Sequence, residues 1–328
     1  MSHAEKFIAE SRIFRSPLFQ ANWLKFVSGR ERAYDLLKIF SEKFKLTKPD
    51  GSSKYEVKQA NGLTFFTDPE KPKLEDGEMA VYPFFDEGIQ LSKIVSGVVA
   101  ERGKKFDVTI DPFCGGGHSG VPMLGNDLTE RVILNDLNPR ATNLARANAE
   151  LNGLGERATI LERDIVKDGL SDSDSPGNTL FIANPPFALR AKGASMEKMR
   201  DGGPNGLTLT MSFASQAVEK AQPGDVIVGV AYSRIGEDGK IELTEELKKL
   251  IEDHGGDLEV SLIEGESLWR GFNGKKEQPN PMPINEDTFA LKADPAKLDE
   301  VAAYKTAAQF HNKEGYTQLG YFSYIIRK

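Results

Sequence analysis

The chain has 328 residues and a formal net charge of -7, with 39% hydrophobic and 28% charged residues. This composition is typical of a globular protein with a buried core and excludes collagen-like, disordered and disulfide-rich classes. Its single cysteine, Cys114, and four histidines predict neither a disulfide nor a bound metal. No apolar run of about 18 residues predicts a membrane span. Because no secretory signal is recognisable either, we expect a cytoplasmic protein without a membrane partner.

The first 80 residues are expected to form an extension ahead of the main domain. Apolar residues at helical spacing predict helices over residues 1–50. Apolar stretches at 55–57 and 63–66 predict two short strands, joined by a hairpin turn at Asn61-Gly62. Residues 67–80 are polar and contain prolines, so we expect a loop there.

Strands and helices are expected to alternate from about residue 87. Helices are predicted at 89–100, 140–152 and 207–221, and strands at 106–110, 132–134, 158–161, 179–183 and 225–230. Strands separated by helices predict an α/β fold with an open, mostly parallel sheet and helices on both faces. The stretches 258–263 and 321–326 are each candidates for an antiparallel edge strand. Residues 265–318 lie between these two stretches, and we expect them to be a loop-rich insert.

A glycine-rich turn follows the first of these strands. Residues 111–117 read Asp-Pro-Phe-Cys-Gly-Gly-Gly, and consecutive glycines let the backbone approach a ligand closely. The turn has no Gly-Lys-Ser/Thr, and Phe113 and Cys114 interrupt the spacing of a dinucleotide site. Asp136 and Asp164 end the next two strands, where carboxylates can meet ribose hydroxyls and an adenine edge. The three acids together predict a nucleoside ligand, although each one alone is also explained as a strand-terminal or helix-capping residue.

The run Asp111–Gly117, with Asp136 and Asp164, resembles the S-adenosylmethionine site of class I methyltransferases. The resemblance implies a Rossmann-like domain over residues 81–328, with a seven-stranded, mostly parallel sheet and S-adenosylmethionine as cofactor. Many members have Gly where this chain has Phe113, but the Asp-Pro-Phe-Cys-Gly form is similar to that of RNA methyltransferases. Residues 82–91 resemble the segment that lines the methionine pocket. The cofactor-binding residues that this resemblance implies are Asp111, Phe113, Cys114, Gly115, Gly117, Asp136, Leu137, Asp164, Ile165 and Asn184.

The segment Asn184-Pro185-Pro186-Phe187 follows the fourth predicted strand. The two prolines fix the turn and remove two N–H donors. A substrate NH2 group could donate to the side-chain oxygen of Asn184 and the carbonyl of Pro185, while Phe187 offers a flat face to a planar group. Such bonds direct the nitrogen lone pair towards an electrophilic methyl group, which is catalysis by positioning. A strand-ending turn with Phe187 in the core is the alternative interpretation.

This tetrapeptide resembles the [Asp/Asn/Ser]-Pro-Pro-[Tyr/Phe] motif of amino-methyltransferases, and among them most resembles the ribosomal RNA guanine-N2 group. That group commonly has His where this chain has Ala188. The resemblance implies that residues 184–187 are catalytic and that methyl is transferred to a planar exocyclic or amide nitrogen on RNA, at guanine N2 or adenine N6. A glutamine amide of a protein and a small molecule remain alternative acceptors. A non-catalytic module that binds S-adenosylmethionine is a third hypothesis.

Basic residues suggest where a polyanionic substrate could bind. Residues 1–60 hold 12 Lys and Arg against 7 Asp and Glu, whereas the rest of the chain is acidic. Arg190 and Lys192 lie in the loop after the tetrapeptide and would suit a phosphate backbone. Trp269 and Arg270 could stack on a base. Solvated loops and core packing explain the same residues equally well.

Overall fold

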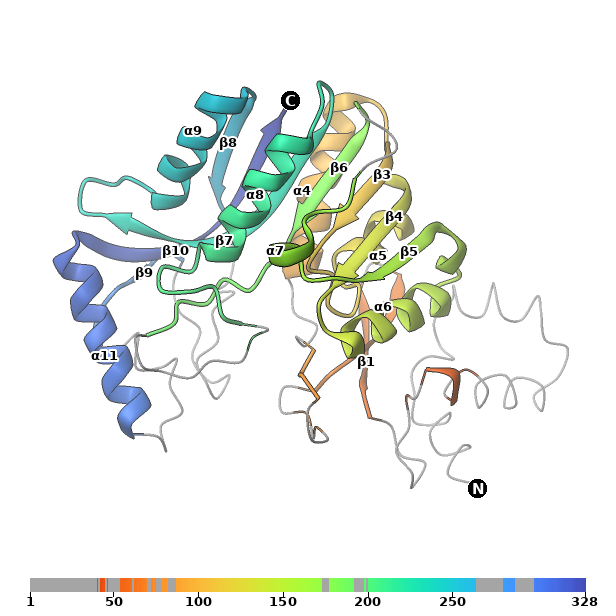
Figure 1. Ribbon diagram of the computed structural model, residues 1–328, viewed down its shortest axis with the longest axis horizontal. Coiled ribbons are helices and arrows are strands. Elements are labelled where there is room, and N and C mark those ends of the chain that lie inside the picture. Colours follow the sequence, from red (N-terminus) through yellow and green to blue (C-terminus); the bar gives the residue numbers. More distant parts are fainter. Residues whose placement is uncertain are drawn as a thin grey trace, which may run out of the picture. The chain divides into compact units, whose positions relative to one another are not determined.

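The computed structural model describes two compact units, Met1–Asp168 and Gly169–Lys328, which we treat separately (Figure 1). Several residues that the sequence analysis singled out lie outside the described residues. They are residues 82–86 of the segment 82–91, the candidate substrate residues Lys192, Trp269 and Arg270, and most of residues 1–50. Within the described part, no helix is long and apolar enough to cross a membrane. The described residues are 40, 42–44, 46, 54–60, 62–69, 72, 74, 78–81, 87–172, 177–191, 198, 200–263, 280–286 and 298–328.

The first unit is built on three parallel strands. The central strand is β4 (Thr129–Asp136), which pairs with β3 (Phe106–Asp111) on one side and β5 (Ala158–Glu162) on the other. Five of the six residues of β3 are buried, as is typical of a parallel strand covered by helices. The described helices that follow the first strands of this unit are α4 (Glu87–Arg102), α5 (Gly120–Gly125), α6 (Pro139–Leu151) and α7 (Ile165–Asp168), with a 3-10 turn at Gly155–Arg157.

A hairpin precedes these strands, as the sequence predicts. Strands β1 (Glu56–Ala60) and β2 (Leu63–Thr67) are antiparallel. All five residues of β2 are buried and the strand contacts α6, whereas β1 is largely exposed. The hairpin is therefore packed into the core of the first unit through β2.

The second unit combines parallel and antiparallel pairing. Strand β6 (Thr179–Ala183) runs parallel to β7 (Val226–Gly236). The long β10 (Tyr316–Arg327) is antiparallel to β7 and to β8 (Asp257–Leu262), and the short β9 (Met282–Pro283) also joins it. Figure 1 shows α8 (Thr208–Lys220) in front of β7, and α11 (Leu298–Lys313) beside β10. Helix α9 (Glu242–His254) packs against α8 and β7.

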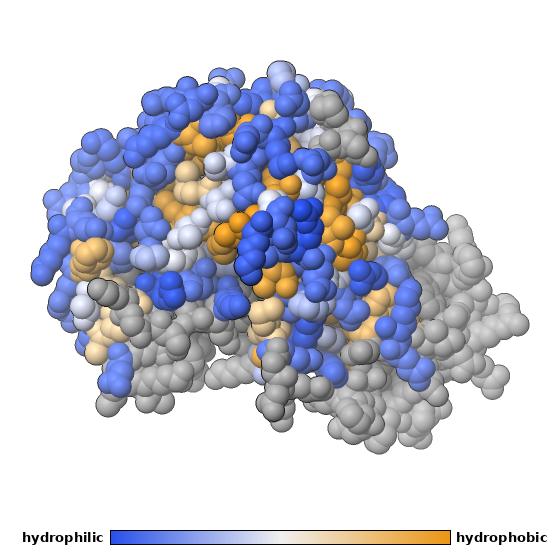
Figure 2. Space-filling model, viewed as in Figure 1, coloured by the Kyte–Doolittle hydropathy of each residue, from blue (hydrophilic) through white to orange (hydrophobic). Residues whose placement is uncertain are grey.

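The predicted α/β, Rossmann-like class is confirmed, with parallel pairings β3–β4, β4–β5 and β6–β7. Of the two candidates for an antiparallel edge strand, β8 takes that place among the described strands, because it pairs antiparallel with β10 and ends the strand order. Strand β10 is not an edge strand, because residues 319–326 are buried and pair with β7 and β8 on either side. Residues 298–313, expected to be loop-rich, form α11, because this stretch is free of the glycine and proline that mark residues 271–283. Among the residues drawn in colour in Figure 2, hydrophilic ones are prominent, with hydrophobic ones visible between them.

Candidate cofactor and catalytic site

Asp136, at the end of β4, holds the glycine loop. Its Oδ2 accepts a hydrogen bond from the Gly115 amide at 2.9 Å, and its Oδ1 accepts one from the Asn138 amide at 2.9 Å. Gly115 and Gly117 have φ angles of 51° and 81°, a conformation that favours glycine. The carboxylate predicted to bind ribose therefore also shapes the loop. A carboxylate can accept about four hydrogen bonds, so this group can still accept one from a ligand hydroxyl.

Asp111 presents a buried carboxylate at the end of β3. Its Oδ1 accepts from the Phe113 amide at 3.3 Å, whereas Oδ2 makes no well-formed hydrogen bond within the described part of the chain. Burial raises the pKa of Asp111 to about 7, and the neighbouring Asp136 adds to the rise, while the amides of Phe113 and Gly120 oppose it. Burial likewise raises the pKa of Asp136. Two neighbouring carboxylates with no cationic partner in the described part of the chain are complementary to a positively charged ligand.

Asn135 joins the segments that follow β3 and β5, although it belongs to no recognisable motif. Its Nδ2 donates to the carbonyls of Pro112 at 3.3 Å and Arg163 at 3.1 Å, and its own carbonyl accepts from Cys114. Its buried Oδ1 has no partner among the described residues. A single polar side chain thus ties together the three strand ends that carry the predicted acids.

The third acid has a local role in the structure. Oδ1 of Asp164 accepts from the Val166 amide at 3.1 Å and so caps α7. The side chain of Ile165 is buried, but Leu137 is 45% exposed and Val166 is 63% exposed. Large exposed apolar side chains beside the strand ends offer a contact surface to a planar, apolar group. Val166 is a candidate that the sequence analysis did not single out.

Neither Cys114 nor His118 is poised for acid–base or nucleophilic chemistry. Burial raises the pKa of the Cys114 thiol well above its usual value, so the thiolate is disfavoured. Burial lowers the pKa of His118 to about 4. Its Nε2 lies 3.4 Å from the carbonyl oxygen of Phe66, and its ring meets Phe65 edge-on. No cluster of metal-binding side chains occurs among the residues described.

The tetrapeptide 184–187 follows β6 in the second unit. Asn184 is half-buried, and its side chain makes no hydrogen bond to the part of the chain that the structure describes. Phe187 is only 8% exposed. Its ring lies edge-on to Tyr232 at a centroid distance of 4.8 Å, and 5.5 Å from the ring of Tyr321. Asn184 is therefore available to a ligand, whereas most of Phe187 is used in an aromatic cluster.

Backbone hydrogen bonds join the beginning and the end of the loop that follows the tetrapeptide. The Ala188 amide donates to Arg200, and the Arg190 amide donates to Gly203, both at 2.9 Å. The Arg190 guanidinium also pairs with Asp201 at 3.3 Å. A Cβ at Gly202 would lie 2.5 Å from the Cα of Phe187, so only glycine fits this approach. The returning segment therefore wraps the backbone of Phe187.

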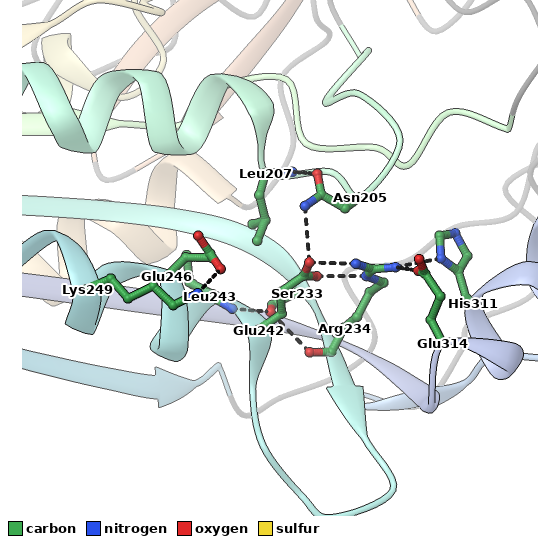
Figure 3. Close-up of polar contacts among 10 residues, drawn as sticks. All are labelled: Asn205, Leu207, Ser233, Arg234, Glu242, Leu243, Glu246, Lys249, His311 and Glu314. Atoms are coloured by element: carbon green, nitrogen blue, oxygen red, sulfur yellow. Dashed lines mark hydrogen bonds and ion pairs between the residues drawn. The ribbon is translucent and has the colours of Figure 1, made fainter.

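A buried ion-pair network supports this returning segment (Figure 3). The Asn205 side chain donates to Glu242 at 3.2 Å, and Glu242 is bound by both Nε and Nη2 of Arg234, at 2.7 and 2.6 Å. Arg234, only 7% exposed, also pairs with Glu314 at 2.7 Å and contacts Nδ1 of His311 at 2.9 Å. The network links the loop behind Phe187 to α9, β7 and the end of α11. Its members are far apart in sequence, so no local pattern predicts it.

The chain shows local similarity to one curated protein. Over 131 residues it is 30% identical to the tRNA (guanine(26)-N(2))-dimethyltransferase of Methanopyrus kandleri. The aligned part is 39% of this chain and 33% of that protein, so the chain spans about a third of the length of this relative. No family model matches the chain.

Several solved structures resemble the fold at low identity. TYW2 of M. jannaschii in complex with AdoMet has a TM-score of 0.44 and 15% identity, covering 84% of this chain and 87% of that one. TYW2 of P. horikoshii in complex with MeSAdo has a TM-score of 0.45 and 15% identity, covering 85% and 74%. Trm5b of Pyrococcus abyssi has a TM-score of 0.44 and 16% identity, covering 68% and 53%. At these identities and scores, the three structures do not bear on function.

Proposed function

We propose that the protein is an S-adenosylmethionine-dependent N-methyltransferase that acts on a planar exocyclic nitrogen of RNA, at guanine N2 or adenine N6. The observation that carries the proposal is Asn184, a half-buried amide without a hydrogen-bond partner in the described part of the chain, in an Asn-Pro-Pro-Phe turn. The motif belongs to the amino-methyltransferase group that the sequence resembles.

The strand ends of the first unit fit the proposed cofactor. Asp111 is buried and Asp136 is half-buried, neither has a cationic partner among the described residues, and S-adenosylmethionine carries positive charge on its sulfonium and ammonium groups. Asp136 would accept from the ribose hydroxyls, and Leu137 and Val166 would contact the adenine. The glycine loop would pass the methionine part. Bound there, the cofactor supplies an electrophilic methyl group.

The residues of the tetrapeptide would act by orientation. The oxygens of Asn184 and Pro185 would accept hydrogen bonds from the substrate NH2 group, which aims the nitrogen lone pair and leaves it free to attack. The pre-set backbone of the two prolines avoids the cost of ordering the turn on binding. Phe187, held by Tyr232, would keep the planar acceptor in register through its remaining exposed edge. The proton leaves to water after transfer, so no general base is needed.

RNA is favoured as the substrate by the local similarity to a protein named as a tRNA (guanine(26)-N(2))-dimethyltransferase. The basic N-terminal 60 residues and the exposed Arg190 are consistent with a polyanionic partner. These observations support the guanine-N2 or adenine-N6 assignment over a protein amide or a small molecule.

The proposal is tested with methyl-labelled S-adenosylmethionine and a cell extract, followed by ribonuclease or protease. We expect label that ribonuclease releases and protease does not. Asn184→Ala should abolish turnover while cofactor binding is retained, because it removes the side-chain carboxamide whose oxygen would accept from the substrate NH2 group. Asn184→Asp is the matched control, since it keeps an acceptor oxygen and should retain part of the activity. Label released only by protease would move the assignment to a protein, and full activity of Asn184→Ala would refute the catalytic role.

A further inference from the structure

The β1–β2 hairpin is fastened to α6 by two asparagine side chains one helical turn apart. Oδ1 of Asn148 accepts from the Phe66 amide at 2.7 Å, and its Nδ2 donates to the Phe66 carbonyl at 2.9 Å. Asn152, just after α6, makes the same pair of bonds with Thr64, at 2.9 and 2.7 Å. The two side-chain amides therefore bond to β2 in the way that the backbone of a neighbouring strand would.

Of these two residues, Asn148 alone reaches the glycine loop. Its Nδ2 also donates to the Gly116 carbonyl at 2.8 Å. By contrast, Nδ2 of Asn152 donates its second hydrogen bond to the Asn148 carbonyl at 2.7 Å. His118 forms a second connection, because its Nε2 lies 3.4 Å from the Phe66 carbonyl. A Cβ at Gly116 would come within 2.8 Å of that same nitrogen. Asn148 thus bonds to both β2 and the glycine loop, and His118, which directly follows the loop, reaches β2.

Because Asn148 is buried, breaking its hydrogen bonds is costly. Its side chain is fully buried, as is β2 around Phe66, so water cannot replace a broken bond. The loop is then held at two points, with the Gly115 amide bound by Asp136 and the Gly116 carbonyl bound by Asn148. Loosening either the hairpin or the loop leaves buried polar groups unpaired, which ties their conformations together.

We propose that Asn148 is a positioning residue, through which the β1–β2 hairpin holds the glycine loop in the conformation that binds S-adenosylmethionine. This inference rests on the proposed function, and it assigns residues 56–67 a role in cofactor affinity. Because coupling between two sites is reciprocal, damage to this connection weakens cofactor binding, and cofactor binding in turn stabilises the hairpin.

The chain offers a matched pair of variants, Asn148→Asp and Asn152→Asp. Each keeps the acceptor oxygen and replaces the donating NH2 group with an oxygen that faces two carbonyls, so both should lower stability in urea titrations. Calorimetric titration with S-adenosylmethionine should show about tenfold weaker binding for Asn148→Asp, the effect of losing one buried hydrogen bond. Binding to Asn152→Asp should remain within about twofold of wild type. Equal losses of affinity in the two variants, or none in Asn148→Asp, would overturn the inference.

A measurement on the wild-type chain covers the case in which Asn148→Asp fails to fold. Amide hydrogen exchange is followed with and without saturating S-adenosylmethionine. We expect the Phe66 amide, which donates to Asn148, to exchange more slowly when the cofactor is bound, by roughly threefold or more. Exchange at Phe66 that is unchanged while the cofactor binds would overturn the inference and leave the proposed function standing. A wild-type chain that binds no S-adenosylmethionine would overturn both.

Discussion

Replacing Asp111 by Asn should change how the stability of the protein depends on pH. Burial raises the pKa of Asp111 from 3.8 to about 7. Between these two values the folded chain keeps a proton on this carboxyl that the unfolded chain has lost. The stability that this group contributes is therefore complete below pH 3.8 and declines as the pH rises to 7. At 1.36 kcal/mol for each pKa unit, the wild type should lose about 4 kcal/mol across this interval relative to Asp111→Asn.

The assay is urea denaturation of the wild type and Asp111→Asn at several pH values from 4 to 8. The difference in unfolding free energy between the two proteins isolates Asp111 from the other titrating groups. Asp107→Asn is the control for the substitution itself, because Asp107 lies on the same strand but is exposed. If the difference between wild type and Asp111→Asn is the same at pH 4 and pH 7, the burial argument for this carboxylate is refuted.

Three further predictions follow from buried groups. Replacing Arg234 by Met leaves Glu242 and Glu314 without their buried cation, so the unfolding free energy should fall by roughly 3–5 kcal/mol, and an unchanged urea midpoint would contradict this. His118, whose pKa is lowered from 6.5 to about 4, contributes stability above pH 6.5 that is lost as the pH falls to 4. The advantage of wild type over His118→Gln should thus shrink by about 3 kcal/mol over that interval, and a constant advantage would exclude a neutral, buried imidazole. Cys114 should react with a thiol reagent only after unfolding, so rapid labelling of the native protein would show that its thiol is accessible.

The α/β class and the order of the elements follow from the sequence because strand and helix periodicities are local. The short apolar runs at 106–110 and 179–183 predict buried strands. The Asn-Gly turn predicts the hairpin at 55–66. Strand β10 shows the limit of this reasoning. Its apolar side chains reveal a strand, but its place between β7 and β8 depends on which partners bury its two edges.

The candidate site likewise has features that the sequence predicts and features that depend on tertiary packing. Local motifs and strand periodicity predict that Asp111 and Asp136 end successive strands, that Asp164 follows the next strand and that Asn184 follows the fourth, because these patterns involve neighbouring residues. By contrast, three contacts depend on tertiary packing: Asp136 holds Gly115, Phe187 packs on Tyr232, and Asn148 joins a hairpin 82 residues away to the glycine loop. Such contacts depend on which buried polar groups meet once the chain has packed. The hydrogen-bond partner of a buried side-chain amide can be remote in the sequence, so local sequence patterns do not predict it.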